Sequence, residues 1–565
     1  MNNFITSLVL FSSLLAPSAL KEASLSTPTK KNADIGSGSQ TLRLLNVEDY
    51  IYEKDPEDPE SEKNLVLQFE DYAKELGYKN VHVSYSTTDT PESMFNELKI
   101  SQDNFDLICP SDYMIQKLIV NDMLEPMHID EEHMPNYIQN ASKTIKGRLD
   151  AISAVNAKTG ETCYLKDYAV GYMWGTLGLL FDPAYGGRDA ETTIEDMQEW
   201  NVLWNPDYKG ISSIKDSVRD TYAIGLLHAY DEEFKSLKKS FDDGEITAEK
   251  YNEDFSDLFN RCDDETLEKV RESLSKLKGN VFGMEVDSGK QDIVTGKIGI
   301  NFAWSGDAVY SMEQAEEEKE LELYYSIPNT GSNLWMDAWC MPKSSQRSQA
   351  QKELAELFLD FLSTPEYTAQ NMDYTGYTPF TAGNEILDLT REWYDYRYDE
   401  ETEEFDDTIP TAEEIAEKGL QRVDLSYFFE GTLTDENGDV IDDPDAYIFY
   451  TDCYLPNAET DAEGNIIDAI DEEGNSISNR AVGRESFCQF PDEYTLTRCA
   501  VMRDFGSQNE AVLKMWEKFK SDALPVWAIV LFVIEIAAAL ALVGYFFIGN
   551  RVKHSLRKKR KESSK

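Results

Sequence analysis

Aromatic rings stand next to carboxylates at four places where a strand is expected to end. Carboxylates pair with ammonium groups, and the face of an aromatic ring attracts a cation by roughly 0.5–2 kcal/mol. Aromatic walls also bury methylene chains. Each residue alone is more simply a packed ring or a solvated acid, but their joint occurrence suits an alkyl chain that carries ammonium groups. The segments are Glu48-Asp49-Tyr50, Ser111-Asp112-Tyr113, Trp304 and Trp335-Met336-Asp337.

The sequence carries no signature of an enzyme active site or of a metal centre. It has no nucleophile elbow, Walker loop, Rossmann fingerprint or HExxH motif. With only five His and no CxxC pair, a zinc site is not expected. Three acidic turns, at 434–439, 460–465 and 471–475, lack the spacing of a calcium loop and are better explained as hairpin turns. We therefore expect a protein that is not an enzyme and that needs no metal or cofactor.

Strands alternate with helices in the segments that hold the aromatic and acidic residues. The expected strands cover 41–45, 81–86, 106–109, 170–181 and 297–304, and the expected helices cover 64–76, 93–100 and 345–362. This alternation predicts an α/β chain with a parallel sheet. Ligands of open α/β sheets bind beyond the carboxyl ends of the strands, which is where Ser111 stands.

Charge is distributed unevenly along the 565 residues. The net charge is -53, with 106 Asp+Glu against 53 Lys+Arg, and this excludes most nucleic-acid binders because they need a basic face. Hydrophobic residues make up 41% of the chain, so disorder of the whole is excluded as well. Residues 391–480 hold 28 acidic and five basic residues, which indicates an inserted acidic module of strands and loops. The last 15 residues instead have a net charge of +7.

An apolar run over 523–548 separates the basic end from the acidic bulk. About 20 apolar residues span a bilayer, and Lys and Arg gather on its cytoplasmic side. We therefore expect a single C-terminal transmembrane helix at the cell membrane, a cytoplasmic tail at 549–565 and an extracytoplasmic bulk. Glu535, in mid-span, is either a contact for a partner or a protonated group without a specific role. Residues 1–19 resemble a signal segment, and 20–40 a linker.

Eight stretches of the chain resemble the motifs of one family. They are LLNVEDYI at 44–51, FDLICPSDYMIQKL at 105–118, GYMWGTLGLLFDP at 171–183, LWNPDYKG at 203–210, DSVRDTY at 216–222, GKIGINFAWSGDA at 296–308, LWMDAWCMP at 334–342 and GYTPF at 376–380. In combination they are similar to the bacterial spermidine/putrescine-binding proteins, the substrate-capturing components of polyamine ABC importers. The resemblance runs from about Leu42 to Phe380, with a shorter recurrence near 501–519.

This resemblance implies a periplasmic-binding-protein-like fold, in which two α/β lobes joined by a hinge close on a ligand between them. The chain is expected to cross between the lobes near 167–174 and to return near 326–335. The expected parts are 41–168 and 331–390 for lobe 1, 169–330 for lobe 2, 391–490 for the acidic insertion and 491–522 for a C-terminal helical part of the binding domain.

The resemblance also implies binding roles for nine residues. Four are aromatic walls, two form a hydrogen-bonding pair and three are carboxylates: Tyr50, Trp304, Trp335 and Tyr377; Ser111 and Tyr113; Asp49, Asp220 and Asp337. Two positions depart from the family. Val47 stands where a Trp is usual, so one stacking wall is lost, and Ser217 stands where an Asp is usual.

We therefore expect a binding protein that captures putrescine or spermidine without chemistry and delivers it to the permease subunits of an ABC transporter. A second hypothesis is a protein of the same fold for another cationic ligand, for which the two departures leave room. A third is an acidic surface adhesin or signalling module without a transport role, suggested by the insertion. The preference between the two polyamines depends on how many carboxylates line the cleft.

Overall fold

The computed structural model describes residues 40–55, 61–399, 401–435, 437–441, 443–456, 458–467 and 480–521. The chain up to Gln508 forms one compact unit, and the rest belongs to a second unit, of which helix α21 (Asn509–Ser521) is described. The signal-like segment at 1–19 and the linker up to residue 39 lie outside the described residues.

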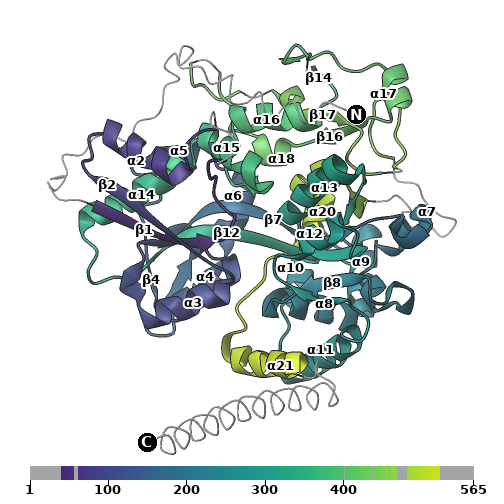
Figure 1. Ribbon diagram of the computed structural model, residues 1–565, viewed down its shortest axis with the longest axis horizontal. Helices are drawn as coiled ribbons and strands as arrows, with labels where there is room; N and C mark the ends of the chain where they lie inside the picture. Colours follow the sequence, from purple (N-terminus) through teal and green to yellow (C-terminus); the bar gives the residue numbers. More distant parts are fainter. Residues whose placement is uncertain are drawn as a thin grey trace, which may run out of the picture. The chain divides into compact units, whose positions relative to one another are not determined.

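A mixed sheet runs through the first unit, with the strand order β2-β1-β3-β12-β7-β10-β8-β9 along its main path (Figure 1). These strands are β1 (Gln40–Val47), β2 (Val81–Thr88), β3 (Leu107–Ile108), β7 (Ala169–Phe181), β8 (Ser212–Lys215), β9 (Gly283–Glu285), β10 (Ile300–Trp304) and β12 (Ser332–Pro342). At one end β1 pairs in parallel with β2 and β3, and at the other β8 pairs in parallel with β9 and β10. The predicted α/β architecture with parallel strands is thus confirmed in both halves of the sheet.

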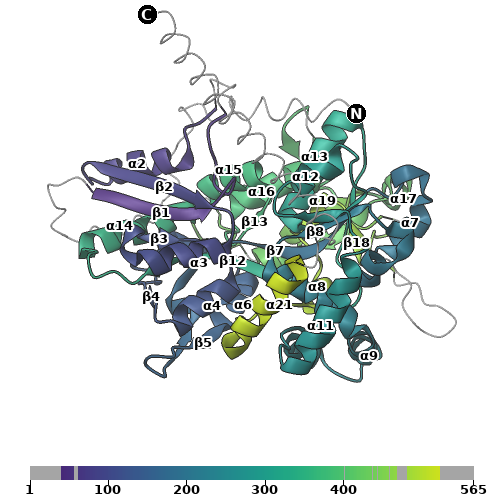
Figure 2. The same ribbon diagram turned by 60° about the horizontal axis from the view of Figure 1, so that its bottom comes forward.

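The two long strands β7 and β12 connect these halves. Residues 334–340 of β12 pair antiparallel with 169–176 of β7. Residues 177–181 of β7 pair instead with β10 on one side and, at 179–181, with β11 (Tyr324–Ser326) on the other. Since every residue of β7 is buried, the strand belongs to the core of both halves. In Figure 2 the ribbon of β7 and β12 lies between β1 and β2 on one side and β8 on the other.

Helices cover both faces of the first half. α2 (Leu65–Glu75) packs on β2 and α14 (Gln349–Leu362) on β1, while α3 (Pro91–Ile100) and α4 (Asp112–Val120) lie on the opposite face (Figure 1). Thr90 starts α3 because its side chain accepts a hydrogen bond from Ser93 N, and Ser348 with Gln351 forms a capping box at α14. The predicted helices therefore begin and end within a few residues of the observed ones.

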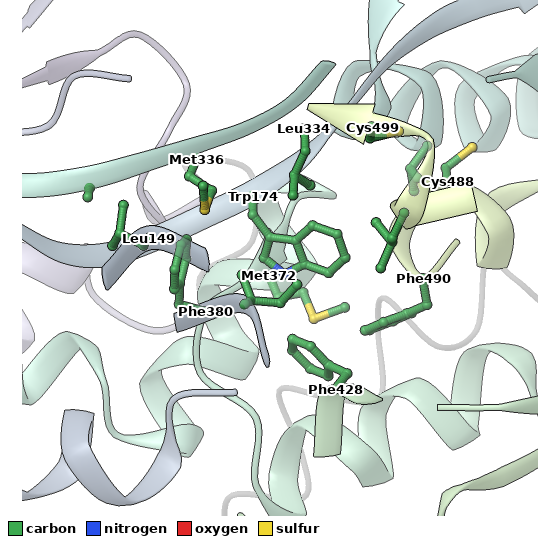
Figure 3. Packing of buried hydrophobic residues seen from close by; sticks show 14 of the residues in the cluster. Leu149, Trp174, Leu334, Met336, Met372, Phe380, Phe428, Cys488, Phe490 and Cys499 are labelled. Atoms are coloured by element: carbon green, nitrogen blue, oxygen red, sulfur yellow. The ribbon is translucent and has the colours of Figure 1, made fainter. Parts of the chain in front are cut away.

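The acidic insertion packs into the main core and contains helices as well as strands. Phe428, on α18 (Ser426–Phe429), and Phe490 lie beside Trp174 of β7 (Figure 3). α18 contacts α6 (Lys143–Ala151) of the first half, and α19 (Glu485–Gln489) contacts α13 (Ser305–Lys319) of the second. Two predicted hairpin turns are confirmed by the bridges Thr434–Val440 and Thr460–Ile466. The third, at 471–475, lies outside the described residues.

The expected fold class and localisation need a correction, because both included a C-terminal transmembrane helix. Over the part of the chain that the structure describes, no helix is long and apolar enough to cross a membrane. α21, the last described helix, has 13 residues. Its length is therefore about 20 Å, which is less than the roughly 30 Å thickness of the hydrocarbon layer of a bilayer. The segment 523–548, Glu535 and the tail at 549–565 lie outside the described residues. The structure thus supports the two-lobed α/β part of the expected fold class and not the transmembrane helix, on which the expected membrane contact and localisation depended.

Candidate ligand-binding site

Strand β12 places Trp335 and Asp337 on the same face because side chains two residues apart in a strand point the same way. The pairing with β7 is irregular between Asp337 and Ala338, and such a bulge re-aims the neighbouring side chains. Asp337 Oδ2 accepts a hydrogen bond of 2.9 Å from the hydroxyl of Tyr50. Asp337 Oδ1 is buried and accepts no hydrogen bond from the described residues. One carboxylate oxygen therefore remains available to a donor from a ligand.

Burial raises the pKa of Asp337 to about 6, although the neighbouring hydroxyls of Ser111 and Tyr50 favour the ionised form. Asp112 lies close by, and its Oδ2 accepts a 2.9 Å hydrogen bond from Met336 N. Burial, with the charge of Asp337 as a further cause, raises the pKa of Asp112 well above its usual range. A cation placed against these carboxylates would lower both pKa values again, since an opposite charge favours the ionised form.

Three aromatic rings form a continuous wall beside Asp337. The ring centroids of Tyr50 and Tyr377 are 5.1 Å apart, and those of Tyr377 and Trp335 are 5.5 Å apart, all in edge-to-face contact. Trp335 is held in place by a 3.1 Å hydrogen bond from Nε1 to the carbonyl of Thr176 on β7. The rings are thus fixed by both crossing strands and by the loop after β1.

The second half of the sheet contributes a network of charges at the carboxyl ends of β8, β9 and β10. The Tyr377 hydroxyl donates a 2.7 Å hydrogen bond to Asp307 Oδ1. Asp307 Oδ2 accepts a 3.2 Å hydrogen bond from Lys215 Nζ, which lies 4.3 Å from the centroid of the Trp304 ring. The predicted ring of Trp304 is therefore already in contact with a cation of the protein itself.

A third group of carboxylates involves residues from both halves. Glu92, on α3, accepts a 3.1 Å hydrogen bond from the Tyr113 hydroxyl. Asp220, in the first turn of α8 (Val218–Ala229), is buried, and Ser217 caps that helix by accepting from Asp220 N. Burial raises the pKa of Asp220 to about 6, and the negative charge of Glu92 contributes to the shift. Burial also raises the pKa of Glu92. Glu92 and Asp220, from different halves of the sheet, are thus close enough for their charges to interact, and the nearby cations Lys215 and Arg219 partly offset the pKa shift of Asp220.

Most of the predicted site residues come together, and one does not. Tyr50, Ser111, Trp335, Asp337 and Tyr377 lie together at the crossing strands. Tyr113 and Asp220 are both close to Glu92, and Trp304 is linked to Asp307 through Lys215. Asp49 lies instead in an exposed turn with a positive φ of 50°.

Sequence reasoning missed four charged residues of the site: Glu92, Lys215, Glu285 and Asp307. Lys215 and Glu285 end strands β8 and β9, and Asp307 lies in the quoted stretch GKIGINFAWSGDA. The available signal was a position at a strand end for Lys215 and Glu285, and in the first turn of a helix that follows a strand for Glu92 and Asp307.

Comparison with known proteins assigns the chain to a family. Residues 68–386, more than half of the chain, match the family of bacterial extracellular solute-binding proteins. The chain belongs to this family. Its members bind solutes and are not enzymes, in agreement with the expectation from the sequence.

Two curated relatives of this solute-binding protein are named for the polyamines spermidine and putrescine. The spermidine/putrescine-binding periplasmic protein of Escherichia coli (strain K12) is 24% identical over 320 residues, which are 56% of this chain and 75% of that protein. The putrescine-binding periplasmic protein PotF of the same organism is 23% identical over 350 residues, 61% of this chain and 78% of that protein. A solved structure, a putative spermidine/putrescine ABC transporter from Listeria monocytogenes, is 21% identical with a TM-score of 0.49 and covers 85% of this chain and 99% of that one.

Proposed function

We propose that this solute-binding protein captures a polyamine of the putrescine/spermidine class between its two lobes and delivers it to the permease of an ABC transporter. The observation that carries the proposal is the free Oδ1 of Asp337, buried at the centre of the crossing strands beside three aromatic rings. An ammonium group is a compact donor that suits a single carboxylate oxygen, and the rings of Tyr50 and Trp335 can enclose the methylene chain.

The raised pKa values of the site support a cationic ligand. Burial raises the pKa of a carboxylate because the ionised form loses its hydration. A neighbouring ammonium ion stabilises the ionised form again. Asp337 and Asp220 both have a pKa of about 6, and they stand on different halves of the site. A dication that contacts both would draw the halves together, whereas without it the negative charges of Asp220 and Glu92 oppose closure.

Titration calorimetry of the full-length protein with putrescine and spermidine tests the proposal. We expect exothermic binding of at least one of the two, with a dissociation constant that rises with ionic strength because the contacts are charged. An uncharged butanediol serves as the control ligand and should give no heat. Absence of heat with both polyamines would refute the proposed ligand class, and a thermal-shift response to another cation instead would favour the second hypothesis.

Polyamine affinity should fall as the pH drops from 7.5 to 5. Both Asp337 and Asp220 have a pKa of about 6 in the ligand-free protein, so each becomes protonated as the pH falls through 6 and must then lose a proton to bind an ammonium group. Primary ammonium groups stay charged over this range. The linkage predicts a loss of about tenfold per carboxylate at pH 5. Calorimetry at pH 5.0, 6.0 and 7.5 measures this slope, and equal affinities at all three values would show that neither carboxylate pairs with the ligand.

A further inference from the structure

Lys215 is a fully buried cation placed where the sequence predicts a binding ring. Its side chain is 0% exposed, and Nζ lies 4.3 Å from the Trp304 ring centroid, within the range of a cation–π contact. Nζ donates hydrogen bonds to Asp307 Oδ2 at 3.2 Å and to the carbonyl of Val286 at 3.1 Å. It also forms an ion pair of 3.1 Å with Glu285 Oε1. A ring, two carboxylates and a carbonyl thus surround one ammonium group.

Two lysines of the protein face the buried carboxylates at this position. Glu285 and Asp307 are both buried and face Lys215, while Lys290 lies 2.8 Å from Asp287 and 3.9 Å from Asp307. The positive charges of the two lysines therefore offset the buried carboxylates. Although burial alone would lower the pKa of Lys215, the charges of Asp307 and Glu285 raise it, so the side chain stays protonated.

The two other acidic positions of the site, Asp337 and the Asp220–Glu92 pair, differ from the Trp304 position in their hydrogen bonds and pKa values. Asp337 keeps a buried oxygen without a donor, and the Asp220–Glu92 pair has raised pKa values. A chain of contacts links the three positions: Lys215 bonds to Asp307, Asp307 accepts from Tyr377, and Tyr377 packs on Tyr50, which donates to Asp337. These contacts form one continuous network, and Lys215 places an ammonium group of the protein itself at the Trp304 position.

We propose that Lys215 is a built-in ammonium group that permanently fills the cation subsite at Trp304, so that the cleft selects a diamine, with cations at Asp337 and at Asp220, over a triamine. This inference rests on the proposed function and names the preferred substrate within it. A third ammonium group of a ligand would meet Lys215 at the Trp304 ring, and two like charges in a buried site repel each other. Lys215 is accordingly a specificity-determining residue.

The test compares the wild-type protein with Lys215→Ala and Lys215→Met. Alanine removes three carbons and the ammonium group, which leaves a space bordered by Trp304, Asp307 and Glu285. Calorimetry should show that the wild type prefers putrescine to spermidine, and that both variants shift the ratio of the two dissociation constants toward spermidine by about tenfold or more. Methionine keeps most of the packing and serves if the alanine variant does not fold. The matched control is Lys250→Ala, which removes an exposed lysine from a surface ion pair on a helix and should leave the ratio unchanged.

A second readout does not depend on polyamine binding. n-Propylammonium replaces the atoms that Lys215→Ala removes, so at millimolar concentration it should raise the melting temperature of this variant and leave the wild type unchanged. 1-Propanol, which has a similar shape without the charge, should not do so. An unaltered putrescine-to-spermidine ratio in both variants, or no selective stabilisation by n-propylammonium, would overturn the inference. If the wild type bound neither polyamine while n-propylammonium still stabilised the alanine variant, the polyamine function would fail and the internal ammonium subsite would stand.

Discussion

Asp337→Asn should weaken polyamine binding by on the order of a hundredfold or more. The substitution keeps the size of the side chain and removes the negative charge that is proposed to face the ligand, at a half-buried position beside Tyr50 and Trp335. Removing one partner of a buried ion pair costs about 3–5 kcal/mol, because the remaining charge stays desolvated without a counter-charge. Calorimetry with putrescine measures the loss directly. The variant should also lose part of the pH dependence between 7.5 and 5, since one of the two titrating carboxylates is gone.

The control for Asp337→Asn is Asp257→Asn. Asp257 is an exposed carboxylate that pairs with Arg503, so its replacement changes the net charge by the same amount without touching the cleft. Its affinity should stay within about twofold of the wild type because exposed pairs contribute little. Equal affinities of all three proteins would remove Asp337 as the ligand anchor, and an equal loss in both variants would indicate that only the overall charge attracts the ligand.

Trp174→Ala should lower the free energy of unfolding by about 3–5 kcal/mol. Trp174 is fully buried on β7, packs against Phe428 with ring centroids 6.1 Å apart, and donates a 3.1 Å hydrogen bond from Nε1 to the carbonyl of Pro379. Figure 3 shows Met372, Leu334 and Phe490 around the same ring. Truncation would therefore open a cavity among four segments and leave a buried carbonyl without its donor. The shift of the urea midpoint of the full-length protein measures this loss.

Leu67→Ala is the matched control for this truncation. Leu67 is 43% exposed on α2, so its shortening removes apolar atoms that are already largely in water. Its effect on the free energy of unfolding should stay within about 1 kcal/mol. A loss at Trp174 no larger than that at Leu67 would show that the core relaxes around the missing ring.

The fold could be predicted from the sequence wherever a local pattern determines the structure. The apolar spacing of 64–76 and the strand-like runs at 81–86 and 297–304 gave elements that match α2, β2 and β10 within a few residues. The partners of these elements were harder to predict. The acidic composition of 391–480 suggested an inserted module of strands and loops, whereas the structure also has helix α18 there. Phe428 of this helix packs into the common core, because a few buried rings determine packing and the surface charges do not.

In the candidate site, too, several residues could be predicted from the sequence but their contacts could not. Residue types and resemblance predicted Tyr50, Trp335 and Asp337, yet the hydrogen bond between Tyr50 and Asp337 joins residues 287 positions apart and required the structure. Lys215 was missed because a lysine at the end of a strand is usually a solvated residue, whereas the structure buries it against Asp307 of α13, which is 92 residues away in the sequence. Asp49 was included by the resemblance, and the structure places it in an exposed turn with positive φ, close enough to Lys290 for their charges to interact.

The insertion has a consequence for the way in which this protein melts. Phe428 and Phe490 belong to the same apolar cluster as Leu45 of the first half and Ile298 of the second. α18 touches a helix of one half, and α19 touches a helix of the other. Because loss of packing in one half would expose apolar surface of the other, we expect the unfolding of the two halves to be coupled. We therefore expect the unfolding of a single half to be less favourable here than in a protein of two independent lobes.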